Sequence, residues 1–312
     1  MSAALRTPAG LLEALPPLGG RATAAAALAS FTWFRVGGPA EVMVRPADAE
    51  DLAVFLAALP TEVPVTVIGA ASNLIIRDGG IPGIVIRLPA RGFGGITVEE
   101  GGIVAGAAAL DATVAEHAAQ AGLAGLEFLS GVPGTVGGAV AMNAGAYGGD
   151  VAGILDWAEI VCRSGETRRL SAAELALAYR YSALPPGAVV VRARFSARQG
   201  ERMPIAGRMA AIRAAREATQ PIRARTGGST FRNPLGMKAW ELIAAAGCRG
   251  LARGGAVVSE KHCNFLINTG GASAADLEGL GEEVRRRVRE TTGVTLEWEI
   301  RRLGIPAEER AP

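Results

Sequence analysis

The sequence predicts an α+β fold in two domains. Its 312 residues are enough for two domains of roughly 100–200 residues each, with a sizeable core. Short apolar segments typical of buried strands alternate with helical segments up to about residue 200. From Met203 the order changes to helix, loop, helix, strand, helix and strand. The sequence contains no fixed-period repeat and no low-complexity linker, so we expect the two domains to share close interfaces.

Segments of the first part have the alternating or β-branched apolar pattern of strands: Glu41–Arg45, Pro64–Ile68, Gly83–Leu88, Thr97–Glu99, Gly102–Gly106, Asp156–Arg163, Thr167–Leu170 and Ala188–Ser196. Hairpins are expected where turn residues separate two such segments, at Glu100-Gly101 and at Ser164-Gly165. Asp48 and Asp111 are expected to cap helices that run to about Leu59 and Gln120, because an aspartate there accepts from free N–H groups.

The second part is expected to end in a long helix and a strand. Ser273 begins the helix, which runs to about Thr291, and Gly293 ends it. Residues of this helix have the i,i+4 spacing of ion pairs: Glu282, Glu283, Arg286 and Arg287. We therefore interpret the arginine run 285–289 as a solvated helix face, and Val294–Arg302 as the final strand.

Charge and composition exclude several function classes. The 32 Lys and Arg residues against 30 Asp and Glu give a net charge of +2, without the surplus that general nucleic-acid binding requires. The sequence has no run of about 18 apolar residues that could span a membrane. The Ala-rich stretch 22–29 lacks the basic start and leucine-rich segment of an export signal. We expect a cytoplasmic protein with no nucleic-acid or membrane partner.

The scarce metal-ligating residues argue against a metal site. With only two histidines, His117 and His262, one chain cannot build a three-histidine zinc site. Cys162, Cys248 and Cys263 form no C-x-x-C pair and are odd in number, so we interpret them as reduced, buried thiols. His117 is expected on a helix surface.

Glycine is concentrated in loops next to apolar strands, where backbone N–H groups can approach a phosphate. Two loops stand out: IGAASNL at 68–74, and SGVPGTVGGA at 130–139, which is followed by MNAGAYGG at 142–149. Neither matches the Rossmann or P-loop pattern. Two interpretations remain: tight turns that pack strands closely, or cradles for a diphosphate-bearing cofactor across two subdomains. Embedded polar residues favour the cofactor: Ser72, Asn73, Thr135 and Asn143.

At these loops the chain resembles a known family. The matching segments occur in family order from about residue 31 to 304: FRVGGPA at 34–40, GAASNLIIRDGGIPGIVI at 69–86, SGVPGTVGGAVAMNAGAYG at 130–148, YRYS at 179–182, GSTFRNP at 228–234, KHCNFLIN at 261–268 and LEWEIR at 296–301. Together they resemble the UDP-N-acetylenolpyruvoylglucosamine reductase (MurB) family, flavoenzymes of peptidoglycan precursor synthesis. Residues 183–187 lead directly into a strand, which resembles the family's shorter type without a tyrosine-bearing lid insertion.

The resemblance implies an FAD-binding region of the vanillyl-alcohol-oxidase (PCMH) type in two α+β subdomains, plus a smaller α+β substrate-binding domain. We place the FAD-binding region at 21–200, with subdomains at about 21–90 and 91–200, and the substrate domain with its catalytic strand at 201–304. The tails, 1–20 and 305–312, are expected to fray. The implied reaction is NADPH-dependent, FAD-mediated reduction of UDP-N-acetylglucosamine enolpyruvate to UDP-N-acetylmuramate. No obligate protein partner is inferred, and we expect a monomer.

The same resemblance implies the catalytic residues. Hydride reaches C3 of the enolpyruvyl group, charge accumulates on the carboxylate side, and C2 then receives a proton. Arg180 matches the arginine that stabilises the enolate carboxylate, Ser229 matches the proton donor to C2, and Glu299 matches the carboxyl that works with the arginine. Glu297 shares the strand face of Glu299, and the family's Leu-Glu-Pro-Glu pattern selects Glu299, with Trp298 in place of proline.

The two glycine-rich loops are implied to bind FAD through Gly69, Ala70, Ala71, Ser72, Asn73, Gly131, Gly134, Thr135, Gly137, Gly138 and Ala139. Where this chain has Ala71 the family commonly has glycine, and alanine costs of order 1 kcal/mol if that residue needs a positive φ. The matching segments offer groups for the UDP moiety: Arg225, Asn233 and Lys238. For His262 and Asn264, a substrate contact and a structural role both remain open.

Three other interpretations remain. Another FAD-dependent oxidoreductase of the same fold, such as a 2-hydroxyacid dehydrogenase, is opposed by the segments containing Ser229 and Glu299. A catalytically silent flavin or nucleotide binder would have lost Arg180, Ser229 or Glu299, and all three are present. A nucleic-acid binder has only the arginine run in its favour.

Overall fold

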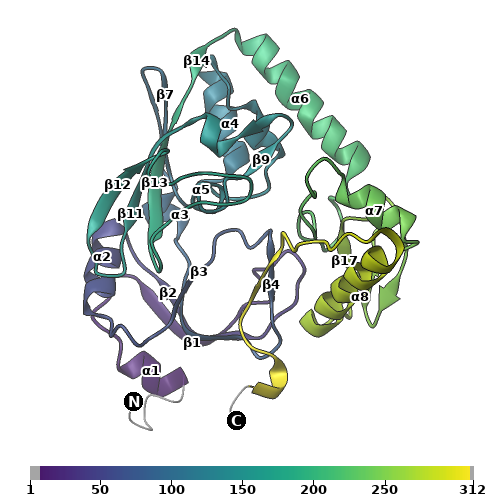
Figure 1. Cartoon of the computed structure of the whole chain (residues 1–312). Helices are drawn as coiled ribbons and strands as arrows, with labels where there is room; N and C mark the ends of the chain where they lie inside the picture. Colours follow the sequence, from purple (N-terminus) through teal and green to yellow (C-terminus); the bar gives the residue numbers. More distant parts are fainter. Residues whose placement is uncertain (1–7, 310–312) are drawn as a thin grey trace. The chain divides into compact units, whose positions relative to one another are not determined.

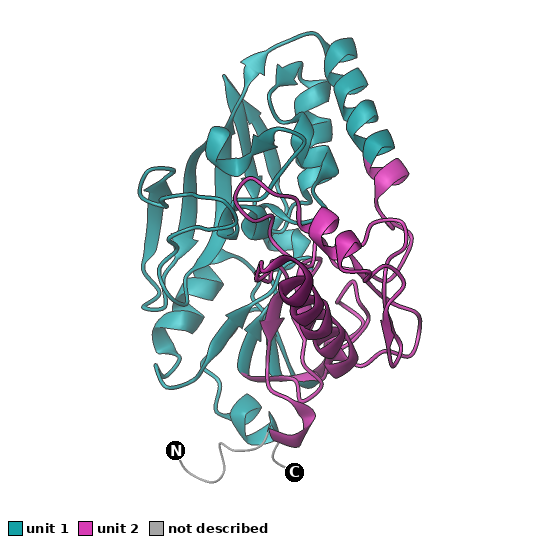
Figure 2. Ribbon diagram, turned by 45° about the vertical axis from the view of Figure 1, so that its right-hand side comes forward, with its two compact units in different colours: residues 1–25, 41–70, 83–215 teal, residues 26–40, 71–82, 216–312 magenta. Residues whose placement is uncertain are grey.

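The computed structural model describes residues 8–309. Helices and strands are interspersed along the chain (Figure 1), and the fold is α+β. The chain divides into two compact units, each made of several stretches (Figure 2): the first comprises Met1–Ala25, Glu41–Ala70 and Gly83–Ala215, and the second Ala26–Ala40, Ala71–Pro82 and Arg216–Pro312. Each unit therefore joins segments that are far apart in the sequence.

The first unit contains a five-stranded antiparallel sheet in the order β12-β11-β13-β7-β6. Its strands are β6 (Ile96–Glu99), β7 (Gly102–Gly106), β11 (Leu155–Val161), β12 (Thr167–Ser171) and β13 (Val189–Ser196). Both expected hairpins are confirmed, because β6 pairs with β7 across Glu100-Gly101 and β11 pairs with β12 across Ser164-Gly165.

Both faces of this sheet pack against apolar clusters at β13. Successive side chains of a strand point to opposite faces, and in β13 Val190 belongs to one apolar cluster while Val189 and Val191 belong to another. The first cluster includes residues of α4 (Asp111–Gln120) and α5 (Val136–Ala141), and the second includes residues of α2 (Ala49–Ala58) and Leu11 of α1 (Pro8–Glu13). Leu11 is thus a core residue within the segment 1–20 that was expected to fray, while residues 1–7 lie outside the described part.

A second sheet of this unit leads into the first glycine-rich loop. It has the order β1-β2-β5-β3, with β1 (Arg21–Ala27), β2 (Pro39–Arg45), β3 (Val65–Val67) and β5 (Ile81–Ile86). The strand β3 pairs in parallel with β5, and the Ile68 N–H continues the pairing by donating to the Ile86 carbonyl at 3.0 Å. The loop therefore starts from a buried, hydrogen-bonded strand end.

Shorter elements complete the first unit: α3 (Ala90–Phe93), the antiparallel pair β8 (Leu123–Ala124) and β14 (Arg198–Gln199), the pair β9 (Gly145–Ala146) and β10 (Gly149–Asp150), and most of α6 (Arg202–Thr219). The expected cap of α2 is confirmed, because the Asp48 carboxylate accepts from the Asp51 N–H at 2.9 Å.

The second unit packs two helices with a small antiparallel sheet. The sheet β15-β16-β17 comprises Ala252–Arg253, Ala256–Val258 and Leu266–Asn268, the helices are α7 (Ala239–Ala245) and α8 (Ala274–Thr292), and β4 (Leu74–Ile76) pairs in parallel with β18 (Arg301–Leu303). The ends of α8 are as expected: Ser273 and Asp276 form a capping box, and Gly293 ends the helix with φ of 76°.

Some expectations about these elements are wrong. Asp111 is the first residue of α4, not its cap, and Leu110 holds the cap position without a side-chain hydrogen bond. The segment Val294–Arg302 is not one continuous strand, because regular pairing begins at Arg301 and is preceded by one isolated bridge between Phe231 and Trp298. In both cases the local structure depends on a residue from a distant part of the sequence: Gly134 accepts from the Asp111 N–H, and Phe231 pairs with Trp298.

The surface pairs on α8 follow the expected pattern in part. The predicted i,i+4 pair Arg287–Glu283 is present, at 2.7 Å. Arg286 instead pairs with Glu283 at 2.7 Å and with Glu290 at 2.6 Å. The arginine run is therefore neutralised by neighbouring carboxylates of its own helix, as expected for a solvated face.

Candidate active site

The two glycine-rich loops meet in the first unit. A β-carbon on Gly69 would lie 2.6 Å from the Thr135 Oγ1, so only glycine fits there without a shift. Thr135 is itself buried and precedes α5. The structure therefore brings together the start of the first loop and the centre of the second, as expected of loops that hold one ligand.

The first loop offers free donors to an anion. Within residues 8–309, the N–H groups of Ala70, Ala71 and Ser72 donate to no other residue. Ala71 has φ of 51°, the left-handed conformation that turns successive N–H groups toward one side and forms anion-binding concavities. The cost considered for alanine at this position therefore applies, because Ala71 does have a positive φ. The donor set fits the diphosphate of FAD.

Several glycines of the second loop are required by packing. A β-carbon on Gly131 would lie 2.8 Å from Tyr147 Cε2. One on Gly134 would lie 2.8 Å from Asp111 Oδ2, and one on Gly137 would lie 3.0 Å from Ala107 Cβ. Gly138 differs, because it is exposed and its nearest neighbour would be 3.7 Å away. We conclude that Gly131, Gly134 and Gly137 shape the loop, and that Gly138 leaves open space suited to a cofactor.

Arg180 lies at a tight turn of the first unit. Ala178 and Tyr181 exchange backbone hydrogen bonds of 3.1 and 3.0 Å, which places Tyr179 and Arg180 at the tip. Arg180 has φ of 56°, as a type II turn requires at its third residue. The guanidinium donates to the Gly145 carbonyl at 3.2 Å and lies 5.0 Å from the Tyr179 ring centroid. A strained backbone at a half-buried arginine is typical of a functional site.

Asn143 supports this turn, and its side chain is used internally. Its Nδ2 donates to the Ala178 carbonyl at 3.0 Å, and its Oδ1 accepts from the Ala152 N–H at 2.8 Å. The residue is buried and has φ of 43°. The sequence suggested Asn143 as a polar group facing a cofactor, whereas the structure assigns it to positioning the arginine turn.

The second unit brings three expected site segments together. The Ser72 carbonyl accepts from the Gly228 N–H at 3.1 Å, and the Asn73 Nδ2 donates to the Glu299 carbonyl at 3.1 Å. The Glu299 N–H donates to the Thr230 carbonyl at 2.9 Å. One set of hydrogen bonds, two between main-chain groups and one from the Asn73 side chain, therefore holds the end of the first loop, the two neighbours of Ser229, and Glu299.

The two carboxylates of the last segment have different surroundings. Glu297 is exposed, and its carboxylate lies 3.8 Å from the Arg232 guanidinium. Glu299 is half-buried. The Ser229 side chain is also half-buried, and no residue within the described range 8–309 binds its hydroxyl. These surroundings agree with Glu299 and Ser229 as the reacting groups.

The expected substrate-binding residues are exposed residues of the second unit: Arg225, Asn233 and Lys238. Asn233 also has a local role, because its Oδ1 accepts from the Ala239 N–H at 3.0 Å at the start of α7. The structure supports the structural interpretation of Asn264, whose side chain exchanges hydrogen bonds with the Phe231 main chain at 3.0 and 2.9 Å. His262 packs edge-on against the Phe265 ring, and burial lowers its pKa.

The remaining histidine and the three cysteines lie away from the candidate site residues in the sequence, and the expectations for them hold in part: Cys162 is less buried than expected. His117 is exposed on α4. The cysteines are free; Cys248 and Cys263 are buried and Cys162 is half-buried, and burial raises the pKa of the two buried thiols. Among residues 8–309, no cluster of histidine, cysteine or acidic side chains could hold a metal ion.

No helix of the described chain is both long enough and apolar enough to cross a membrane.

The chain is similar to known proteins over nearly its whole length. The FAD binding domain model matches residues 40–171, and the model for the C-terminal domain of UDP-N-acetylenolpyruvoylglucosamine reductase matches residues 220–303. The UDP-N-acetylenolpyruvoylglucosamine reductase of Acidiphilium cryptum is 69% identical over 298 residues, which cover 96% of each chain. That of Rhodospirillum rubrum is 59% identical over 307 residues, 97% of this chain and 96% of its own.

A solved structure also matches. The crystal structure of UDP-N-acetylenolpyruvylglucosamine reductase from Thermus caldophilus has a TM-score of 0.78 and 37% identity, covering 92% of this chain and 100% of its own. An FAD-binding region with two converging glycine-rich loops defines a flavoprotein. Its second part matches a reductase domain that includes Ser229 and Glu299, which disfavours the 2-hydroxyacid dehydrogenase alternative. The chain belongs to the UDP-N-acetylenolpyruvoylglucosamine reductase family.

Proposed function

We propose that this chain reduces UDP-N-acetylglucosamine enolpyruvate to UDP-N-acetylmuramate with NADPH, and that Arg180, Ser229 and Glu299 are the groups that act on the substrate. The observation that carries the assignment is the set of hydrogen bonds of 2.9 to 3.1 Å that join Ser72–Asn73, the neighbours of Ser229 and Glu299. These bonds support the proposal that the Ser229 hydroxyl and the Glu299 carboxyl act next to the loop that is suited to FAD. The protein is an FAD-containing oxidoreductase of peptidoglycan synthesis.

Residues Gly69–Asn73 and Gly131–Ala139 would hold FAD, and the N–H groups of Ala70, Ala71 and Ser72 would be donors to its diphosphate. When bound, FAD would supply hydride transfer from NADPH to the methylene carbon of the enolpyruvyl group. The glycines that packing requires keep the loops close enough for backbone donors to reach the cofactor.

The protein's own side chains manage the charge and the proton. The Arg180 guanidinium binds the substrate carboxylate through two parallel N–H donors and stabilises the negative charge that develops there. The Ser229 hydroxyl donates the proton that C2 receives, which completes addition of one hydride and one proton across the double bond. The Glu299 carboxyl assists Arg180 on the developing enol.

The rest of the organisation is proposed from the same motifs. The FAD-binding region spans 21–200, and the substrate-binding domain spans 201–304 with the tails outside them. Exposed Arg225 and Lys238 provide cations for the UDP diphosphate, and the Asn233 amide provides a donor to the nucleotide. The protein works as a monomer in the cytoplasm, without an obligate protein partner.

The test separates the two half-reactions. The FAD-loaded protein is reduced anaerobically with one equivalent of NADPH, mixed with UDP-N-acetylglucosamine enolpyruvate, and followed by flavin absorbance and by product formation. Ser229→Ala should slow reoxidation by roughly 10²- to 10⁴-fold, and Arg180→Lys by about 10²-fold or more. Glu299→Gln should also slow reoxidation, whereas Glu297→Gln, two residues away, is the matched control and should leave it unchanged.

Two outcomes would overturn the proposal. A wild-type flavin that stays reduced in the presence of the enolpyruvyl substrate would rule out this reaction. Equal effects of Glu297→Gln and Glu299→Gln would rule out the assignment of the carboxyl.

A further inference from the structure

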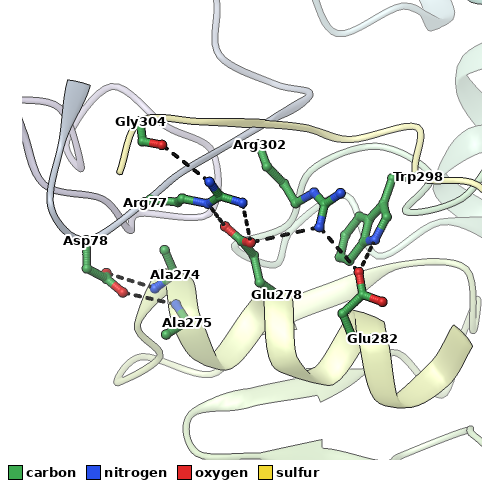
Figure 3. Close-up of polar contacts among 9 residues, drawn as sticks. All are labelled: Arg77, Asp78, Ala274, Ala275, Glu278, Glu282, Trp298, Arg302 and Gly304. Atoms are coloured by element: carbon green, nitrogen blue, oxygen red, sulfur yellow. Dashed lines mark hydrogen bonds and ion pairs between the residues drawn. The ribbon is translucent and has the colours of Figure 1, made fainter. Parts of the chain in front are cut away.

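Trp298, the residue directly before Glu299, is held by contacts on several sides. Its indole Nε1 donates to the Glu282 Oε1 at 2.7 Å, and the Arg302 guanidinium lies 4.7 Å from its ring centroid (Figure 3). The Phe231 ring centroid lies 5.1 Å from that of Trp298. A half-buried tryptophan with a hydrogen-bonded nitrogen, a tilted aromatic ring and a guanidinium against its own ring loses most of its rotational freedom. The side chain is therefore fixed in one orientation.

The helix α8 contains a space for this ring. Gly281 is buried in α8, and a β-carbon on it would overlap the six-membered ring of Trp298. Glycine inside a helix costs about 1 kcal/mol relative to alanine, so its presence at this contact has a packing reason. The ring of Trp298 and the bare backbone at Gly281 form a complementary pair.

A network of charges ties the same helix to both flanking strands. Glu278 binds Arg77, which directly follows β4, with distances of 2.9 and 3.2 Å, and lies 3.9 Å from Arg302 of β18. Glu282 accepts from Arg302 at 3.3 Å as well as from the Trp298 indole. Figure 3 shows Glu278 and Glu282 on successive turns of α8 reaching this pair of arginines and the indole. The indole is thus bound to a helix that ion pairs join to the strand pair β4 and β18.

The backbone transmits this anchoring to Glu299. Trp298 faces Phe231 in a β-bridge, flanked by the hydrogen bonds Arg232 N–H to Glu297 carbonyl and Glu299 N–H to Thr230 carbonyl, both 2.9 Å. Neighbouring side chains in such an extended segment point to opposite sides. An indole locked on one side therefore sets the direction of the carboxyl on the other.

We propose that Trp298 is a positioning residue for the Glu299 carboxyl, acting through its seat on Gly281 and its hydrogen bond to Glu282. The inference rests on the proposed role of Glu299 in the reaction with the enolpyruvyl substrate. Because Trp298 acts only on that carboxyl, it should influence the step in which the substrate is reduced and not the earlier reduction of the flavin by NADPH.

The main test uses Trp298→Ala in the FAD-loaded enzyme, with the two half-reactions followed anaerobically by flavin absorbance. Reoxidation by the enolpyruvyl substrate should slow roughly 10- to 100-fold, the effect of misplacing a reacting group by about 1 Å. Reduction by NADPH should be unchanged. Trp157→Ala is the matched control, because Trp157 is also half-buried with an arginine, Arg169, 4.0 Å from its ring centroid, but lies in β11 of the first unit; it should alter neither rate.

A double mutant distinguishes positioning from general damage. If Trp298 acts through Glu299, the pair Trp298→Ala and Glu299→Gln should reoxidise no more slowly than Glu299→Gln alone. Multiplying effects, or equal slowing of both half-reactions by Trp298→Ala, would overturn the inference while leaving the role of Glu299 intact. If Glu299→Gln itself leaves reoxidation unchanged, the proposed role of Glu299 fails, and the inference fails with it.

A milder variant keeps the test informative if Trp298→Ala does not fold. Trp298→Phe retains most of the ring and removes only the donor to Glu282, and loss of one such hydrogen bond corresponds to roughly a 2- to 10-fold slower reoxidation. Its FAD content and reduction by NADPH should match the wild type. Unchanged reoxidation in this variant and in Glu282→Ala would refute the part assigned to the hydrogen bond.

Discussion

Replacing Asp111 with asparagine should stabilise the protein at neutral pH, by an amount that grows with pH. The Asp111 carboxyl is fully buried, and within residues 8–309 neither of its oxygens has a hydrogen-bond partner. Burial raises its pKa to about 8. The N-terminus of α4 favours a negative charge there, but that effect is at most ~2 kcal/mol. The raised pKa corresponds to on the order of 5 kcal/mol, so burial decides and the carboxyl is neutral at pH 7.

The sign follows from proton linkage. Below the unfolded pKa, near 4, both states are protonated and the group has no effect on stability. Between about pH 4 and 8 the unfolded chain ionises while the folded protein keeps its proton, so stability falls by about 1.4 kcal/mol per pH unit. Asparagine does not ionise, so the free energy of unfolding of the variant has no such pH dependence. The difference in free energy of unfolding between the variant and the wild type should therefore grow by on the order of 4 kcal/mol from pH 4 to pH 7.

Urea unfolding of both proteins, followed by circular dichroism from pH 4.5 to 8 with the same excess of FAD, measures this difference. Asp276→Asn is the control, because hydrogen bonds from Ser273 lower the pKa of Asp276. The stability that the Asp276 carboxylate contributes is present above pH 4 and is lost only as the pH falls through its folded pKa. The change in free energy of unfolding caused by Asp276→Asn should therefore be constant from pH 5 to 8. An Asp111→Asn difference that is also constant over this range would refute the burial argument.

Three further changes test features of the loops and of α8. Ala71→Gly relieves the left-handed backbone strain, a gain of about 1–2 kcal/mol. It also loses a buried methyl group, at about 0.8 kcal/mol, and increases the conformational entropy of the unfolded chain, at about 0.4–1 kcal/mol. Calorimetry should therefore find a change in the free energy of unfolding below about 1 kcal/mol, and a gain above about 2 kcal/mol would contradict this balance. Asn143→Ala removes the side-chain hydrogen bonds to the Ala178 carbonyl and from the Ala152 N–H, which should cost about 1–3 kcal/mol and slow reoxidation, and wild-type kinetics would contradict its support of Arg180. Gly281→Ala should destabilise this chain by about 1–3 kcal/mol in thermal unfolding but have little effect in a Trp298→Ala background; equal losses in both would show that the ring does not occupy that space.

The parts of the fold that sequence patterns predict are those with local causes. The β6–β7 hairpin needs only alternating residues around Glu100-Gly101, and α8 begins at Ser273 and ends at Gly293 through groups within its own first and last turns. The last segment is different. Between Val294 and Ile300 its backbone pairs with Thr230, Phe231 and Arg232, more than sixty residues earlier in the chain. Local alternation cannot show that such partners give an isolated bridge and not a regular ladder.

The candidate site shows the same division between local and distant causes. The glycine that the family commonly has at the position of Ala71 suggested a positive φ there, and the structure shows φ of 51°. Asp111 was expected to cap a helix, because aspartate is common at that position, and this expectation is wrong. The structure buries it against Gly134, a contact set by a loop more than twenty residues further along the chain. Asn143 likewise has the composition of a ligand-binding loop residue, and only the position of the Ala178 carbonyl shows that its amide is already used.

The segment before Glu299 can be fixed in two physically different ways. Proline, the residue suggested by the family pattern, restricts φ and gives up its N–H; at Trp298 that N–H donates to no other residue within 8–309, so a proline would sacrifice no hydrogen bond. Tryptophan leaves the backbone free and transfers the restraint to its side chain. This restraint depends on a glycine at 281 and an acceptor at 282, neither of which a proline would require. Tryptophan in place of proline therefore keeps the direction of the Glu299 carboxyl only while α8 has glycine at 281 and an acceptor at 282. Gly281 and Glu282 are in this sense part of the same functional unit as Glu299.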